Sequence, residues 1–458
     1  MEKTSYKVTL SVILIVVGAS FAVMFSPHSS SARSSDGIVI DFGNWDIVYV
    51  NVNASDTDDA LSALEYACEH EGFTLVVEGG KIVLIDSLPT AEINATWELF
   101  VTPWGSKEWI KVEGDPSDII IRDYSIVAWG LCAEGEFPTT GVDATGYNFY
   151  NYDQPRRSIS LAPSCTETVC SVGALNTIVG TDMYSNYPYA VVENQRLGKI
   201  TIMGGYTNPS YELIVQQNPD IVICISSQVS HTIIAEKLRK IGIDVIVTFD
   251  GEDIDTIMEN IYMVGTGMNY SIPTKETLES INEAMDSVYG DLESYAQIRY
   301  PDVMIALSSV KSPWVSGSGT YVSDILDFTF SNNVYEEQNG WVQVNSESIM
   351  QYNPSMIIMV NSEYPLTEDA YNQMLSSLSA EWKKTDAYVN GEIYLLTEVA
   401  TDLASRPGPR VAQLTELTAR ILHPDAFEDK IIVPKIIGND YENYLTYTKD
   451  LNFNGGGY

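Results

Sequence analysis

The chain has 458 residues, with 25 Lys and Arg against 62 Asp and Glu, so its formal net charge is −37 at pH 7. This length predicts two to four domains, and a hydrophobic content of 45% is enough to fill their cores. The acidic excess excludes nucleic acid as a partner, because binding to phosphates needs Lys and Arg. It also argues against binding to anionic lipid headgroups through a basic surface.

Residues 1–35 predict a signal sequence. Lys3 and Lys7 precede an apolar run over residues 8–25, and a polar stretch follows it. This pattern is typical of a signal peptide or a signal anchor, and it places the rest of the chain outside the cytoplasm. No small-x-small cleavage site is evident, and no Cys lies near the end of the run. We therefore expect a retained transmembrane helix that anchors the protein at the extracellular face of the membrane, with secretion after cleavage as the alternative.

Residues 36–135 predict a small α+β domain. One helical stretch, residues 58–72, carries acidic residues at its start and apolar residues on one face. Five strand-like runs surround it, at residues 47–52, 73–77, 81–85, 97–102 and 124–130. This order favours one helix packed on a mixed sheet. Cys68 and Cys132 are either a disulfide or two buried thiols, and the sequence leaves both open.

The rest of the chain predicts an α/β architecture after a linker over residues 136–155, which is rich in Gly, Pro, Thr and Tyr. Short β-branched strands alternate with helices over residues 156–425. One long charged amphipathic stretch, residues 274–297, separates two such blocks. The expected parts are an N lobe (156–272), a backbone helix (273–299), a C lobe (300–425) and a C-terminal tail (426–458), with both lobes Rossmann-like.

The segment SLAPSCTE ends the first strand of this α/β block and opens a helix. Ser164 and Glu167 have the spacing of a capping box, which explains both residues as helix initiation. The functional alternative puts this helix N terminus at the rim of a cleft between the lobes, where it contacts a ligand acceptor group. Both interpretations remain open at this point.

Five segments of the α/β block, in order, resemble the substrate-binding proteins of ABC importers for cobalamin and iron-siderophore complexes. They are RRSISLAPSCTE, LNTIVGTDMYSNYP, GGYTNPSYELIVQQNPDIVI, SGSGTYVSDILDFTFSNNVYEEQNGWVQVNSESIMQYNPSMIIMV and RPGPRVAQLTELTARILHP. The resemblance implies two lobes that grip a bulky metal chelate and deliver it to a permease dimer with its ATPase. Residues 36–135 are similar to the β-grasp-type C-terminal domain of transcobalamin-like proteins, through DALSALEYACEHEGFTL and WELFV.

The resemblance implies two kinds of functional residue. Glu212 and Glu347 occupy corresponding positions of the two lobes, each before a helix that leads to Asn-Pro and a strand. Family members carry glutamates there that dock into arginine pockets of the permease. The alternative is that both are ordinary first-turn acids stabilised by the helix dipole.

The expected ligand-binding residues lie on loops at the carboxyl ends of the strands, where aromatic faces supply apolar contact area. They are Tyr184, Tyr187, Tyr206, Trp314, Trp341, Asp402 and Arg406. Arg410, on the same segment as Arg406, is expected to cap or pair structurally.

The expected ligand is a corrinoid, with a ferric siderophore or haem as the alternatives. These loops carry no dense Arg cluster, which disfavours a highly anionic catecholate, and the transcobalamin-like domain favours a corrinoid. Four His and five Cys, without metal-site spacing, predict neither a protein metal site nor a covalently bound cofactor. An enzyme is the main rival class, but no nucleophile elbow, P-loop or nucleotide fingerprint is present. A surface adhesion protein with a degenerate binding scaffold is the third.

Overall fold

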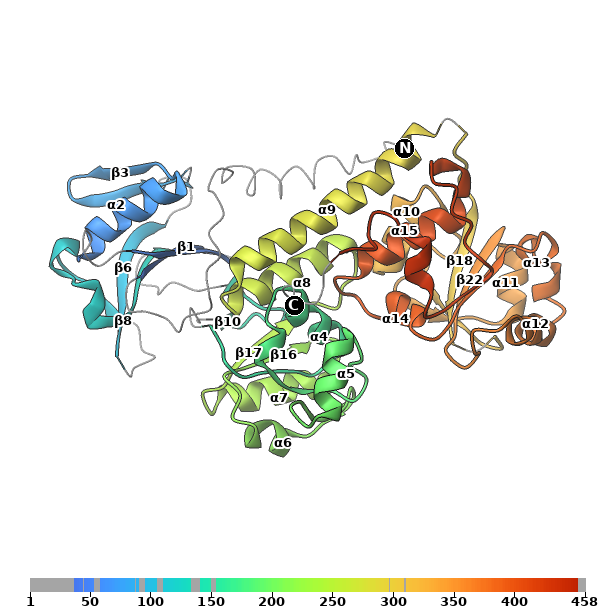
Figure 1. Cartoon of the computed structure of the whole chain (residues 1–458), viewed down its shortest axis with the longest axis horizontal. Helices are drawn as coiled ribbons and strands as arrows, with labels where there is room; N and C mark the ends of the chain where they lie inside the picture. Colours follow the sequence, from blue (N-terminus) through green and yellow to red (C-terminus); the bar gives the residue numbers. More distant parts are fainter. Residues whose placement is uncertain are drawn as a thin grey trace. The chain divides into compact units, whose positions relative to one another are not determined.

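The computed structural model describes residues 37–43, 45–52, 58–86, 88–89, 95–104, 110–132, 141–149, 154–295, 297–308 and 310–451 (Figure 1). The chain divides into two compact units after Gly141. The predicted signal anchor, residues 1–35, lies outside the described residues. Within the ranges given above, no helix combines the length and apolar character needed to cross a bilayer.

The first unit contains a mixed five-stranded sheet and the single predicted helix. Its strand order is β2-β1-β8-β6-β7, with β1 parallel to β8 and the other neighbours antiparallel. The elements are β1 (Gly37–Gly43), β2 (Asp46–Asn51), α2 (Ala60–Glu71), β6 (Thr96–Pro103), β7 (Ile110–Lys111) and β8 (Tyr124–Cys132). A separate antiparallel sheet contains β3 (Leu75–Glu78), β4 (Lys81–Ile85) and β5 (Leu88–Pro89).

Helix α2 packs its apolar face on this sheet. The Asp59 side chain accepts hydrogen bonds from the first turn, and Gly72 ends the helix in the left-handed conformation. Leu64 and Ala67 of the helix share one core with Ile40 of β1 and with β6 and β8. Cys68 and Cys132 are both buried and form no disulfide with one another, so the disulfide alternative is wrong.

Part of the predicted linker packs against the second unit. Arg239 donates a hydrogen bond to the buried Asp143 carboxylate, which also accepts one from the amide of Val247 at 2.9 Å. The Arg239 guanidinium lies 3.8 Å from the centre of the Tyr147 ring. The hairpin of β9 (Gly141–Val142) and β10 (Asn148–Phe149) holds this segment, so residues 142–149 are an ordered part of the second unit.

The N lobe is built on a wholly parallel sheet in the order β13-β12-β11-β16-β17. The strands are β11 (Ser158–Ser160), β12 (Ile178–Thr181), β13 (Thr201–Ile202), β16 (Ile221–Ile225) and β17 (Asp244–Thr248), and a hairpin contains β14 (Gly204–Gly205) and β15 (Asn208–Pro209). The helices are α4 (Pro163–Ser171), α5 (Tyr189–Arg196), α6 (Tyr211–Gln216), α7 (Val229–Arg239) and α8 (Ile254–Gly267). The expected strand–helix alternation is therefore correct.

The C lobe has its own sheet, in the order β21-β19-β18-β22-β23-β24, with β20 also beside β18. Its strands are β18 (Asp302–Leu307), β19 (Trp314–Ser316), β20 (Asn332–Asn333), β21 (Trp341–Gln343), β22 (Met356–Val360), β23 (Ile393–Leu396) and β24 (Ile436–Ile437). Its helices are α10 (Tyr321–Phe328), α11 (Ser346–Tyr352), α12 (Glu368–Ser377), α13 (Asp386–Val389), α14 (Ala400–Ser405) and α15 (Val411–Leu422). The antiparallel strands β19 and β21 extend one edge.

Two expectations for the C lobe need correction. Trp314 and Trp341 lie on the antiparallel strands β19 and β21, and not on loops after parallel strands. Residues 426–458 are not a simple tail, because β24 pairs in parallel with β23 and completes the sheet. In both places the structure is defined by backbone hydrogen bonds between strands, which such short sequence runs do not reveal.

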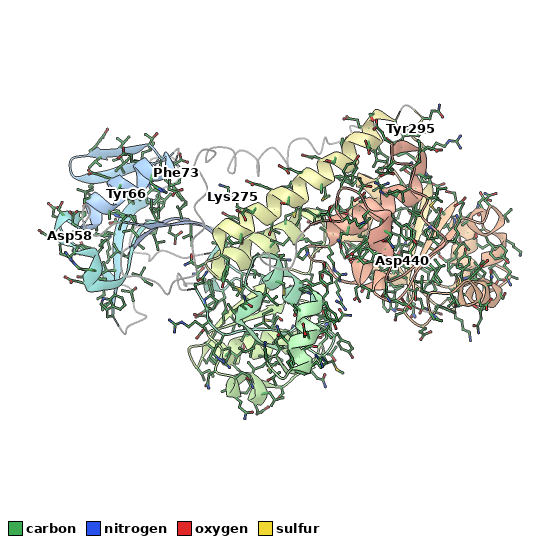
Figure 2. The ribbon with its side chains drawn as sticks, viewed as in Figure 1. Asp58, Tyr66, Phe73, Lys275, Tyr295 and Asp440 are labelled. Atoms are coloured by element: carbon green, nitrogen blue, oxygen red, sulfur yellow. The ribbon has the colours of Figure 1, made fainter. Side chains whose placement is uncertain are left out.

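Helix α9 (Ser271–Ser294) is the long connection between the two lobe sheets (Figure 1). It has 24 residues, begins four residues before Lys275 and ends just before Tyr295 (Figure 2). The hydroxyl of Thr277 donates to the carbonyl of Ser171 at the end of α4. The lobes therefore keep two separate sheets and share one helical backbone, as the sequence predicts.

Candidate functional site

The loop after β12, residues 182–188, lies at the carboxyl end of the N-lobe sheet and is held by several hydrogen bonds. We refer to it as the Tyr184 loop. The carboxylate of Asp182 accepts a hydrogen bond from the amide of Tyr184 at 2.8 Å and one from the hydroxyl of Ser185. Burial raises the pKa of Asp182. This inner anchor turns Tyr184 outward, and the residue is 55% exposed.

Tyr206 lies in the turn between β14 and β15 and packs edge-on against His231 of α7, with 5.5 Å between ring centroids. The Nε2 atom of His231 contacts the carbonyl oxygen of Tyr206 at 2.7 Å, and its Nδ1 atom is 3.4 Å from the amide of Ile225. Burial lowers the pKa of His231, so the imidazole is neutral. Both ring nitrogens are therefore occupied by the backbone, and neither can ligate a metal.

Trp314 and Trp341 lie on one face of the β19–β21 ribbon. Trp314 is opposite Gln343, and Trp341 is opposite Ser316. Residues two positions apart on paired strands are diagonal neighbours on the same face, so the two indoles are within reach of one another. Trp314 is 44% exposed and Trp341 is half-buried. The C lobe thus presents an aromatic pair.

Glu167 is the centre of a buried ion cluster between the lobes. Its carboxylate accepts hydrogen bonds from Nε and Nη2 of Arg410 at 2.8 and 2.7 Å, and from Nη1 of Arg406 at 3.0 Å. The capping-box prediction is wrong, because α4 has Ala162 as its N-cap residue and no side-chain cap. The carboxylate instead neutralises two arginines more than 230 residues away.

Tyr187, Asp402 and Arg406 all join this cluster. The Arg410 guanidinium lies 4.1 Å from the centre of the Tyr187 ring, and burial raises the pKa of Tyr187 to about 12. Asp402 pairs with Nη2 of Arg406 at 2.8 Å, while burial raises the pKa of its carboxyl. Arg410 pairs structurally, as the sequence predicts. The structure thus separates the expected ligand residues into exposed aromatics and an internally paired charge cluster.

Glu212 and Glu347 occupy matching local structures. Each is exposed in the first turn of a short helix, α6 or α11, which Ser210 or Asn345 caps. Each helix then reaches an Asn-Pro pair whose asparagine has φ of 46°. Each glutamate also follows an aromatic residue, Tyr206 or Trp341, by six positions.

Sequence reasoning missed Asn186, which contacts both Asp402 and Arg406. No motif marks this residue, because its partners come from the other end of the block. The sequence marks Glu167 as a helix-capping residue, whereas its partners in the structure are Arg406 and Arg410. Among the described residues, no group of three His, Cys, Asp or Glu side chains is placed to hold a metal ion.

Comparisons with known proteins agree with this architecture. Residues 159–400 match the family model described as periplasmic binding protein. An uncharacterised ABC transporter substrate-binding lipoprotein of Bacillus subtilis is 24% identical over 294 residues, which is 64% of this chain and 88% of that protein. A cobalamin-binding protein of Halobacterium salinarum is 23% identical over 292 residues, 63% of this chain and 74% of that protein. The structure of a periplasmic haem-binding protein from Pseudomonas aeruginosa superposes with a TM-score of 0.50 at 19% identity, covering 60% of this chain and 94% of that one.

Proposed function

Because the chain belongs to the periplasmic binding protein family, and is a substrate-binding protein of an ABC importer, we propose that its ligand is a corrinoid. The observation that carries this proposal is the combination of exposed aromatics with arginines that already take part in ion pairs. Tyr184, Trp314 and Trp341 offer apolar ring faces to a large flat ligand. Tyr206 adds a fourth ring from the N lobe.

The paired arginines argue against an anionic ligand. Arg406 and Arg410 lie at the lobe junction, where Glu167 pairs with both and Asp402 pairs with Arg406. A haem with two propionates or a catecholate siderophore needs unpaired positive charge, which this cluster does not supply. A corrinoid carries neutral amide side chains, so it can bind at a site where the arginines are already paired.

The two histidines of the second unit also argue against haem as the ligand. In the second unit, His231 and His423 both use ring nitrogens on backbone carbonyls, at 2.7 and 2.8 Å. Haem iron usually takes an axial ligand from its protein. A corrinoid brings its own axial ligands and needs none from this chain. Among the relatives, the Halobacterium protein is named for cobalamin.

The topology of the first unit supports the β-grasp interpretation. Two antiparallel hairpins flank a helix, and β1 and β8 form the central parallel pair. We propose that this unit is the transcobalamin-like domain that the sequence predicts. We also propose that residues 1–35 anchor the protein at the outer face of the membrane, where a binding protein meets its ligand.

Retention of added ligands tests the corrinoid proposal directly. Full-length protein is mixed separately with hydroxocobalamin, haem and a ferric siderophore, then passed through a desalting column, and its visible spectrum is recorded. We expect cobalamin bands to co-elute in a one-to-one ratio. Retention of haem or siderophore alone contradicts the corrinoid assignment. Retention of none favours the adhesion alternative, and chemical turnover of a ligand favours an enzyme.

Glu212 and Glu347 are proposed to dock onto the permease dimer and its ATPase. Combined Glu212→Arg and Glu347→Arg should abolish uptake, because reversed charges repel the arginine pockets, while ligand affinity stays unchanged. A matched control is the pair Glu193→Arg and Glu368→Arg, which makes the same charge change at exposed helical positions, including the first turn of α12. Equal loss of uptake in the control, or a loss of ligand affinity in the test pair, contradicts the docking role.

A further inference from the structure

The Tyr184 loop is held on its inner side by the N lobe. Asp182 bonds the backbone of Tyr184 and the hydroxyl of Ser185. The Ser185 hydroxyl also contacts the Thr166 hydroxyl at 2.6 Å, and the side-chain amide of Gln195 donates to the Ser185 carbonyl at 2.9 Å. These contacts fix the buried half of the loop and leave its outer half, with Tyr184 and Asn186, exposed.

The outer half is held by the C lobe. The Nη2 atom of Arg406 donates to the carbonyl oxygen of Tyr184 at 3.2 Å, and its Nη1 atom donates to the side-chain carbonyl of Asn186 at 2.6 Å. The amide of Asn186 donates in turn to Asp402 at 3.2 Å. Three contacts thus cross from α14 and the residue after it to one loop of the other lobe.

Both terminal nitrogens of Arg406 are engaged within the protein. Its two terminal nitrogens make four contacts, to Glu167, Asn186, the Tyr184 carbonyl and Asp402. Its side chain is only 10% exposed. A planar guanidinium can serve these acceptors together, whereas a lysine ammonium lacks the fork geometry. An arginine this occupied is poorly placed to bind a ligand.

We propose that Arg406, with Asp402 and Asn186, forms an interlobe tie that positions the Tyr184 loop for ligand binding, and that Arg406 does not contact the ligand itself. This inference rests on the proposed function, because it treats Tyr184 as a ligand contact. It makes Arg406 a positioning residue. Ligand affinity then depends on a C-lobe residue through the conformation of an N-lobe loop.

Three single variants of the full-length protein test the tie. Arg406→Lys keeps the positive charge beside Glu167 but removes the fork, and Asn186→Ala removes the other partner. Arg196→Lys is the matched control, since Arg196 is exposed on α5, the helix that follows the Tyr184 loop. Amide hydrogen exchange is measured without ligand, and affinity for hydroxocobalamin is measured by titration.

We expect exchange at residues 182–188 to rise about tenfold in Arg406→Lys and Asn186→Ala, with β16 and the control unchanged. Affinity should fall about tenfold in Arg406→Lys and in Asn186→Ala. A double variant that combines these two changes should lose little more, because both act through one tie. A general loss of stability would instead speed exchange at β16 as well.

Three results overturn the proposal. Unchanged exchange in the loop means that Arg406 does not hold it. Faster exchange with unchanged affinity means that the loop conformation does not matter to binding. Weaker binding with unchanged exchange means that Arg406 contacts the ligand directly. If the wild-type protein binds no corrinoid, the proposed function fails, whereas the exchange comparison still decides whether the tie exists.

Discussion

Glu167 illustrates how one residue joins distant parts of the second unit. It is 1% exposed, and its two oxygens accept hydrogen bonds from arginines at positions 406 and 410. Placing charges in a protein interior costs solvation energy, which only well-directed partners offset. The geometry here is good, with a bidentate contact to Arg410. The cluster therefore depends on every partner being present.

Glu167→Gln tests that dependence. The substitution keeps the shape but removes the counter-charge that Arg406 and Arg410 share, so we expect the free energy of unfolding to fall by about 3–5 kcal/mol. Denaturant unfolding of the second unit measures it. Glu193→Gln, at an exposed site on α5, should cost less than about 0.5 kcal/mol. Equal effects of the two changes would contradict the buried-pair interpretation.

Asp327 predicts a dependence of stability on pH. Partial burial raises its pKa to about 6, with smaller contributions from the charges of Glu336 and Asp324. It also lies in the last turn of α10, where the helix dipole disfavours a negative charge. Because the folded-state pKa is above the unfolded one, the folded state binds the proton more tightly and gains stability as the pH falls through about 6.

Asp327→Asn should therefore stabilise the protein at neutral pH. The residue is only partly shielded from solvent, and solvent screening limits the gain to less than about 1 kcal/mol. The gain should disappear near pH 4, where the wild-type carboxyl is already neutral in the folded state. Thermal unfolding of both proteins across this range measures the difference. A gain that is constant with pH would show that titration of Asp327 is not its cause.

At the scale of elements, the C-terminal segment after β24 is fastened to α15 through one buried carboxylate. Glu416 is fully buried and accepts hydrogen bonds from the amides of Thr446, Tyr447 and Thr448 and from the Thr448 hydroxyl. Arg420 pairs with the same carboxylate at 2.8 Å. Residues 446–448 are thus attached as firmly as a regular element, although they belong to none.

Two neighbouring substitutions separate the buried contact from an exposed one. Thr448→Val removes the hydroxyl that donates to Glu416 at 2.7 Å and should cost about 1.5–3 kcal/mol, since the acceptor is charged and buried. Tyr447→Phe removes a bond of the same 2.7 Å length to Asp291 of α9, but at the surface, and should cost less than about 1 kcal/mol. Unfolding midpoints give both values. The reverse order would mean that Glu416 does not hold the segment.

The element pattern could be predicted from the sequence where periodicity is strong. The β-branched runs at β11, β12, β16 and β17 and the long amphipathic stretch of α9 required no distant partner. The strands β19 and β21 could not, because three residues carry no period and only their pairing defines them. The residues of the candidate site show the same division between what a local pattern predicts and what only tertiary contacts define. The exposed Tyr184 follows the recognisable strand β12, whereas the partners of Glu167 and Asn186 are set by tertiary contacts.

For the whole molecule, the charge of −37 affects how a ligand arrives. A negative field attracts cations and slows anions, and salt screens it over about 8–10 Å at ordinary ionic strength. A cationic aqua-corrinoid should therefore associate several-fold faster than a neutral cyano-corrinoid in low salt. In about 0.5 M salt the two rates should converge. Stopped-flow absorbance measures both, and a salt-independent ratio would exclude long-range steering.

Helix α9 constrains how binding proteins of this design can diverge. Each residue inserted into an α-helix adds about 1.5 Å and turns everything beyond it by about 100°. A single insertion between Thr277 and Asp291, which fasten α9 near its two ends, would therefore rotate one lobe relative to the other. Only insertions close to whole helical turns, such as about seven residues for two turns, restore the original orientation of one lobe relative to the other. Changes in the loops can thus adjust the space for a ligand gradually, whereas the separation between the lobes changes only in steps.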